Sequence, residues 1–330
     1  MAKKRFNLYE LFNPSRDARG VQAHEWAEEY RKLGFKFYFK LLGRNIGRLI
    51  SINLLYVFGN FPLIFGLLAF SGLLNNTSMS PVSPLYGVLR GVWLLDGGKT
   101  PAFSAMLGIH GLQTTMSYTS TATIVMWCLS GLVLITWGPV NVGCTHLLRS
   151  IVRGEPIFMM SDFFSAIRRN LKQSFIFGVL DIVFMALLAY DVVFFYFNIG
   201  SFMFNVMFYF SLFMVIMYFF MRFYMYLMLI TFELSTFKII KNSLIFSFIG
   251  LGQNFLALLG IAFLVFLFYS LLIIYVPIGI ILPFTILFAV GAYTSCYAAY
   301  GKIKAIMIDP YANDEDEKDK EEPIFRDSTV

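Results

Sequence analysis

Two oppositely charged side chains lie inside apolar stretches of this sequence, where they could form an ion pair or line a pathway for ions. Asp181 and Arg222 each interrupt a run that is otherwise almost free of charge. A charge in hydrocarbon is costly and normally has a partner or a water-filled cavity. If the two runs form an antiparallel hairpin that turns near Ser201, both side chains lie at the same depth. The spacing therefore predicts a packing ion pair, and an ion or substrate pathway is the alternative.

Uncharged polar groups and a helix breaker lie in the neighbouring apolar runs. Asn53 and Asn141 are expected at comparable depth, where interhelical hydrogen bonding is the usual role of asparagine. Gly138 and Pro139 predict a kink that frees backbone carbonyls, either as a structural bend or as part of a binding site. The candidate intramembrane polar site comprises Asp181, Arg222, Asn53, Asn141, Gly138 and Pro139.

Motifs for catalysis or for binding a cofactor are not found. The sequence contains no nucleophile elbow, phosphate-binding glycine loop or HExxH pattern. Its three histidines, His24, His110 and His146, fall in three separate regions. We therefore expect a protein that is not an enzyme, without catalytic residues, cofactor or metal.

The apolar runs that hold these residues have the length of membrane spans. The chain is 58% hydrophobic and 14% charged, which is typical of a membrane protein. A hydrocarbon core of about 30 Å needs about 20 apolar helical residues. Residues 243–300 contain no charged side chain and must turn back once, between Pro277 and Pro283. The other four predicted spans are residues 49–74, 121–148, 174–197 and 204–232.

The distribution of basic residues predicts the orientation of these spans. In a six-span topology, 24 of the 26 Lys and Arg residues fall on one side, which the positive-inside rule assigns to the cytoplasm. The predicted fold is an all-α membrane protein: a six-transmembrane-helix bundle with both termini cytoplasmic, multi-pass in a bacterial cell membrane.

Three segments are expected outside the bundle. Residues 1–48 form a basic N-terminal segment with an interfacial helix, in which Phe35 and Phe39 begin an apolar stripe and Lys36 and Lys40 a basic one. The alternative for this helix is an ordinary charged flank of the first span. The membrane domain, residues 49–302, includes a long outer connection, residues 75–120, with short helices near 85–95 and 103–112. Residues 303–330 form an acidic, solvated tail. The basic stripe predicts contacts with membrane lipids, including anionic headgroups, and no nucleic acid is expected as a partner.

A series of short motifs runs through the predicted membrane domain: Asn53, Leu54, Leu55, Tyr56 and Pro62, then Gly138 and Pro139, then Asp162, Phe163, Phe164 and Asn170, and finally Lys241 and Asn242. In this order the motifs resemble the YesL family of bacterial membrane proteins. The resemblance implies an association with carbohydrate-uptake gene neighbourhoods in Gram-positive bacteria and assigns no catalytic or binding residues. The long outer connection, the extended basic N-terminal segment and the acidic tail depart from the family pattern.

Two functions follow as expectations. The first is a non-enzymatic membrane component, accessory to or regulating carbohydrate uptake through contacts with a partner such as a sugar-transporter subunit. The alternative is a transporter or channel in its own right, with a polar site between the second, third and fourth spans. Against the alternative, the sequence shows no inverted hydropathy repeat.

Overall fold

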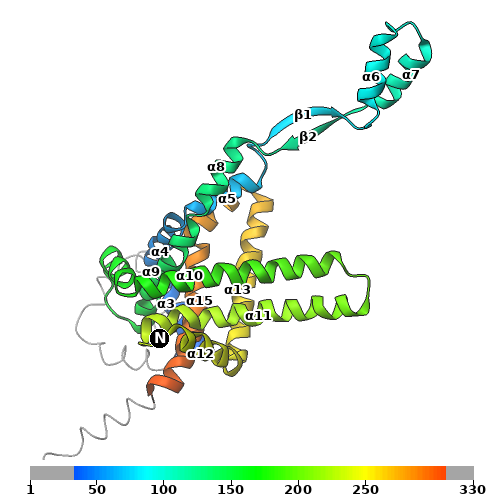
Figure 1. The fold of residues 1–330 in the computed structure, drawn as a ribbon. Helices are drawn as coiled ribbons and strands as arrows, with labels where there is room; N and C mark the ends of the chain where they lie inside the picture. The colour runs from blue at the N-terminus through cyan, green and yellow to red at the C-terminus, as the bar shows by residue number, and fades with distance from the viewer. Residues whose placement is uncertain (1–32, 310–330) are drawn as a thin grey trace, which may run out of the picture. The chain divides into compact units, whose positions relative to one another are not determined.

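A computed structural model describes residues 33–309 of the chain (Figure 1). The expected basic segment before residue 33 and the acidic tail beyond residue 309 lie outside the described residues. The chain divides into two compact units. The first contains the residues up to Asn60 and from Leu134 onward, and the second contains Phe61–Val133.

Several described helices are long and apolar enough to cross a membrane. Five qualify by themselves, and a sixth span exists only if the pair Ile46–Gly59 and Pro62–Phe70 counts as one. The structure therefore confirms a predominantly helical fold, with five to six candidate membrane spans among residues 33–309. The five single spans are Thr121–Arg153, Met159–Phe197, Phe202–Thr231, Leu251–Ile274 and Val276–Ile308.

The expected first span, residues 49–74, is not one continuous helix. Helix α4 (Ile46–Gly59) ends before Asn60, and α5 (Pro62–Phe70) starts after Phe61. Pro62 has no backbone N–H to continue the helical ladder, but it is tolerated in the first turn of a new helix. The proline thus explains why the span is broken, and the prediction of an unbroken helix is wrong.

Helices α10 (Met159–Phe197) and α11 (Phe202–Thr231) form the long hairpin of the first unit (Figure 1). Their connection contains Ser201, where the turn was predicted. Large apolar side chains at the tip are exposed: Phe197 is 77% and Phe202 86% accessible. Such surface is unfavourable in water and suits contact with lipid tails. The buried core lies at the other end of the hairpin, where α11 is packed from Phe220 to Ile230.

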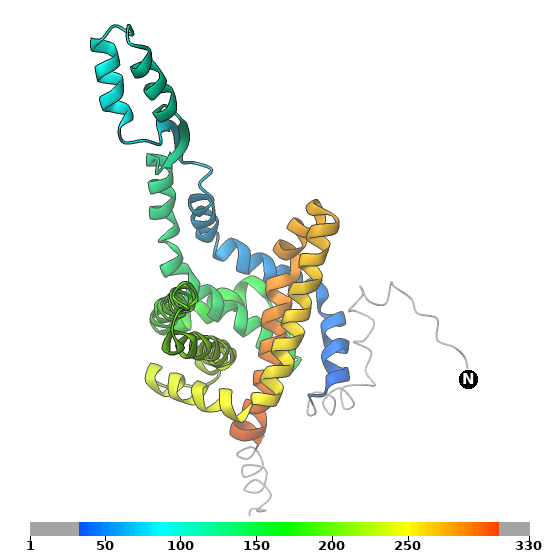
Figure 2. The same cartoon turned by 90° about the vertical axis from the view of Figure 1, so that its right-hand side faces the viewer.

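The last two spans lie side by side (Figure 2). After α13 the chain reverses at Tyr275, whose backbone is extended (φ −150°, ψ 96°), and Pro277 lies in the first turn of the next helix. The reversal is thus two residues ahead of the predicted interval. The elements after the hairpin are α12 (Thr236–Ile249), α13 (Leu251–Ile274), α14 (Val276–Leu282), the π-helix η2 (Pro283–Leu287), α15 (Phe288–Ile303) and the π-helix η3 (Lys304–Ile308).

Helix α3 (Phe35–Arg44) occupies the region predicted as an interfacial helix. Phe37 and Leu41 are buried, while Phe35 and Phe39 are 66% and 54% exposed. The hydroxyl of Tyr38 lies 2.7 Å from the hydroxyl of Thr294 in α15. One face of α3 therefore packs on the protein, and the two phenylalanines that begin the predicted apolar stripe stay exposed.

The second unit contains most of the long outer connection. The two short helices predicted there are present, but the strands that support them were not predicted. The strands pair antiparallel from Asn76↔Tyr118 to Pro81↔Gln113. They are rich in Ser and Thr and lack the alternating apolar residues that indicate a strand. The elements are β1 (Asn76–Pro81), α6 (Tyr86–Leu95), α7 (Pro101–His110), β2 (Gln113–Tyr118) and α8 (Thr121–Ser130), which packs against α5.

Candidate functional site

Helices α9 (Val133–Arg153) and α10 come into backbone contact at two glycines. A Cβ atom on Gly138 would overlap the backbone carbonyl of Ser174. A Cβ atom on Gly178 would lie 2.6 Å from the Cα of Gly138, closer than packing allows. Gly138 therefore serves close helix packing, and this contact brings the side chains that follow it in α10 next to those of α9.

Helix α9 has no break at Gly138 and Pro139, where a kink is expected. It runs without interruption from Val133 to Arg153, and Pro139 lies inside it. The interruption in this span comes earlier, at Gly131 and Leu132. Because the helix restarts at Val133, the carbonyl that faces the proline ring belongs to its first turn. The proline therefore disturbs the hydrogen bonds only near the start of α9.

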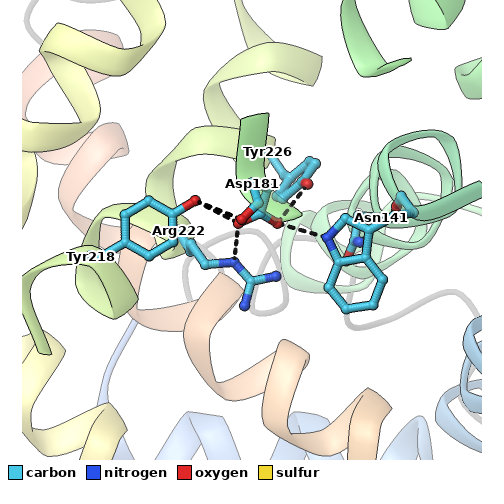
Figure 3. A network of polar contacts seen from close by, with 6 residues as sticks. Asn141, Asp181, Tyr218, Arg222 and Tyr226 are labelled. Atoms are coloured by element: carbon cyan, nitrogen blue, oxygen red, sulfur yellow. Dashed lines mark hydrogen bonds and ion pairs between the residues drawn. The ribbon is translucent and has the colours of Figure 1, made fainter. Parts of the chain in front are cut away.

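Asp181 is the centre of a polar network that joins three helices (Figure 3). The residue is 0% exposed. Its Oδ2 atom accepts hydrogen bonds from Trp137 Nε1 at 2.8 Å and from the Tyr226 hydroxyl at 2.9 Å. Its Oδ1 atom accepts one from the Tyr218 hydroxyl at 2.7 Å and lies 2.9 Å from Arg222 Nε. Both carboxylate oxygens are therefore occupied by donors from α9 and α11.

Arg222 balances the charge of this carboxylate. Its side chain is 24% exposed, and its guanidinium carbon lies 5.8 Å from the centroid of the Trp137 ring, in the range of a cation–π contact. The Nε–H bond is not aligned for a hydrogen bond to Asp181, so the contact between the two residues is an ion pair. The predicted pair is thus present, and the network as a whole is electrically neutral.

Three partners of Asp181 were not predicted as site residues: Trp137, Tyr218 and Tyr226. The sequence spacing indicates two of them, Tyr218 and Tyr226. Each lies four residues from Arg222, so all three side chains share one face of α11. The signal was hidden because aromatic residues occur on every side of this helix. Trp137 directly precedes the glycine of the helix contact, and its indole N–H needs a partner when it is buried.

The two asparagines of the candidate site lie outside this network. Asn53 in α4 is 0% exposed; it donates to the carbonyl of Phe284 at 2.7 Å and accepts from the N–H of Ala289 at 2.9 Å. The expected interhelical bonding is thus present for Asn53, but it holds α4 to the segment from η2 to α15. Asn141 donates to the carbonyl of Trp137 in its own helix, at 2.7 Å. The expected interhelical bond of Asn141 is not observed.

The chemistry open to the network follows from this geometry. A fully buried carboxylate with three hydrogen-bond donors and a cation joins the helices that supply these groups. Two cavities of the described structure lie elsewhere, on the exposed face of α10 near Arg168 and beside Trp93 of α6. Within residues 33–309, no group of three His, Cys, Asp or Glu side chains could hold a metal ion. The contacts of Asp181 thus connect helices α9, α10 and α11.

Comparison with known proteins gives one family match. A family model described as "Protein of unknown function, DUF624" matches residues 49–192. The matched segment includes Asn53, Gly138 and Asp181 and ends before α11, which carries Arg222. No curated protein and no solved structure matches the chain. Over residues 49–192, the chain is therefore similar to a family whose function is unknown.

Proposed function

We propose that this protein is a non-enzymatic, multi-pass component of a bacterial cell membrane that assists or regulates a carbohydrate-uptake system through contacts with another protein. The carbohydrate link comes from the resemblance to the YesL family. The excess of Lys and Arg on one side favours a topology with both termini in the cytoplasm.

The single observation that carries the proposal is that Asp181 is fully buried and that both of its carboxylate oxygens have partners. A site that passes an ion or a polar substrate must expose its charged group to a cavity at some stage. Asp181 is instead fully buried, and each of its oxygens has two partners. Such a network favours a fixed helical framework, which suits a protein that acts through its surface.

A transporter remains the second candidate, because one observation favours it. The ion pair of Asp181 and Arg222 joins two tyrosine hydroxyls, and such chains of titratable and hydroxyl groups occur in proton relays. In that case Asp181 would have to change its protonation state during transport. A neutral residue of the same shape would then abolish function even in a folded protein.

Complementation of uptake distinguishes the two candidates. A strain that lacks the gene should take up one carbohydrate more slowly, and the wild-type gene should restore the rate. The variant Asp181→Asn, expressed to the wild-type level in the membrane, should also restore it, because the side chain holds helices together and carries nothing. Asn254→Asp, which alters a buried polar contact of α11 with α13, is a control for general effects on folding.

Two results would contradict the proposal. Uptake of every tested carbohydrate unchanged in the deletion strain would remove the link to carbohydrates. Loss of uptake in Asp181→Asn at wild-type membrane levels, while the control Asn254→Asp restores uptake, would favour the transporter, because only a pathway needs the charge itself.

A further inference from the structure

The first three turns of α10 carry an open groove whose lining is both apolar and cationic. The groove encloses about 700 Å³. Its residues recur every four positions along the helix, so they form one continuous stripe. The lining residues are Met160, Ser161, Phe164, Ser165, Arg168 and Arg169. The apolar end of the stripe comes first, and the two arginines come at the other end.

The opposite face of this helical segment is anchored to the protein. Phe163 and Ala166 are buried, and the ring of Phe163 packs directly on Gly143 of α9. The groove therefore has a fixed position and faces outward. Arg168 and Arg169 are exposed, and no carboxylate of the described residues lies within ion-pair distance of either. An anionic ligand is the chemical complement of this stripe.

The chain itself contains a segment with the complementary pattern. Nine of its 20 acidic residues lie in the last 22 positions, and seven of these fall within residues 314–322. The acidic run is followed at once by Pro323, Ile324 and Phe325. Acidic residues next to an apolar pair match a groove in which two arginines lie next to Phe164 and Met160. We propose that residues 314–325 of this chain occupy the groove on α10.

The position at which the described chain ends makes this contact reachable. Tyr300, near the end of α15, interacts electrostatically with Arg149, and His146 interacts with both Arg149 and Arg169. These electrostatic interactions relate the last turns of α15 to the cationic end of the groove. From Asp309, an extended chain spans about 17 Å to residue 314 and about 45 Å to residue 322. A segment of this length allows the acidic run to approach the arginines.

The attraction is electrostatic, so its dependence on salt is predictable. The Debye length falls from about 10 Å at 0.1 M salt to about 3 Å at 1 M. High salt should therefore release the segment, although the apolar contact of Phe325 persists. The groove would then be free for an acidic segment of another protein, and this consequence does not depend on the proposed link to carbohydrates.

Distance measurement between two spin labels tests the proposal on the full-length protein. Labels at Leu171→Cys, which is exposed on α10 but does not line the groove, and at Ser328→Cys can be introduced after Cys128→Ser, because Cys144 and Cys296 are buried. An undocked segment of about 19 residues has a broad distribution with a root-mean-square span of about 25 Å. Docking should give a narrow population at short distance in neutral lipid nanodiscs at 0.1 M salt. The double variant Arg168→Gln/Arg169→Gln should lose it, while Lys238→Gln/Lys241→Gln, exposed cations on α12, should keep it.

Three outcomes would overturn the proposal. A broad distribution at low salt would mean that the segment does not dock. A narrow population that persists in Arg168→Gln/Arg169→Gln would place the docking site elsewhere, for example on the basic N-terminal segment. A population that disappears when anionic lipids are added would show that lipid headgroups, rather than the acidic segment, occupy the groove in a membrane.

Discussion

The ion pair of Asp181 and Arg222 should be strongly coupled in a double-mutant cycle. Removing one member of a buried pair typically costs about 3–5 kcal/mol, because the remaining charge has no partner. Asp181→Asn should fall at the upper end of this range. It removes the charge that three N–H or O–H groups donate to, and a hydrogen bond to a charged group is stronger by about 1 kcal/mol than a neutral one.

Arg222→Met should cost less, about 3 kcal/mol, because the three donors still hold the carboxylate. Once Asp181 is neutral, Arg222 has no charge to balance. The double variant should therefore lose no more stability than Asp181→Asn alone, about 4–5 kcal/mol, rather than the sum of about 7–8 kcal/mol. The expected coupling energy is about 3 kcal/mol.

The free energy of unfolding can be measured by titration with SDS in mixed micelles, followed by circular dichroism. The exposed ion pair Arg153–Glu155 is a matched control, since its atoms lie at the same distance, 2.9 Å, but its side chains are 42% and 37% exposed. Its coupling energy should be about 1 kcal/mol or less. Additivity of the Asp181 and Arg222 variants within about 0.5 kcal/mol would refute the argument, because independent sites behave in that way.

Three further predictions concern packing and topology. Gly138→Ala should markedly lower the thermal stability, because its Cβ would overlap the backbone of α10, whereas Gly291→Ala, with open space around it, should not. Asn53→Leu should lower the free energy of unfolding by about 2–3 kcal/mol, because backbone groups near η2 lose their partner. In intact cells, a membrane-impermeant thiol reagent should label cysteines placed within residues 75–120 and not those within 161–172.

Each of these predictions has a clear contrary result. Equal stability of the two glycine variants would mean that α9 and α10 do not touch at Gly138. A neutral effect of Asn53→Leu would show that its hydrogen bonds do not hold α4 to α15. Labelling of residues 161–172 from outside would reverse the orientation of the spans.

The ion pair could be predicted because the depth of a residue in a span and the position of a chain reversal can both be counted along the sequence. Asp181 and Arg222 lie at similar distances from a short connection, and that geometry alone brings them together. The tyrosines around them could not be singled out in the same way. Aromatic residues serve lipid contact and packing as often as polar networks, and only the three-dimensional packing shows that Tyr218 and Tyr226 donate to the carboxylate.

Other features depend on contacts that a single sequence does not contain. Gly138 was interpreted together with Pro139 as a kink, but its role is set by Gly178, which lies 40 residues away in the chain. Tyr38 in α3 likewise contacts Thr294 in α15, a residue 256 positions away in the chain. In both cases the role of a residue depends on a partner that is distant in the sequence.

The most direct test of the proposed function is isolation of the protein from its native membrane after crosslinking in intact cells. We expect a subunit of a carbohydrate transporter to be recovered with it in a fixed ratio, and the purified protein alone in proteoliposomes not to move the carbohydrate. Recovery of the protein by itself, together with carbohydrate or ion flux in proteoliposomes that contain only this chain, would contradict the proposed function.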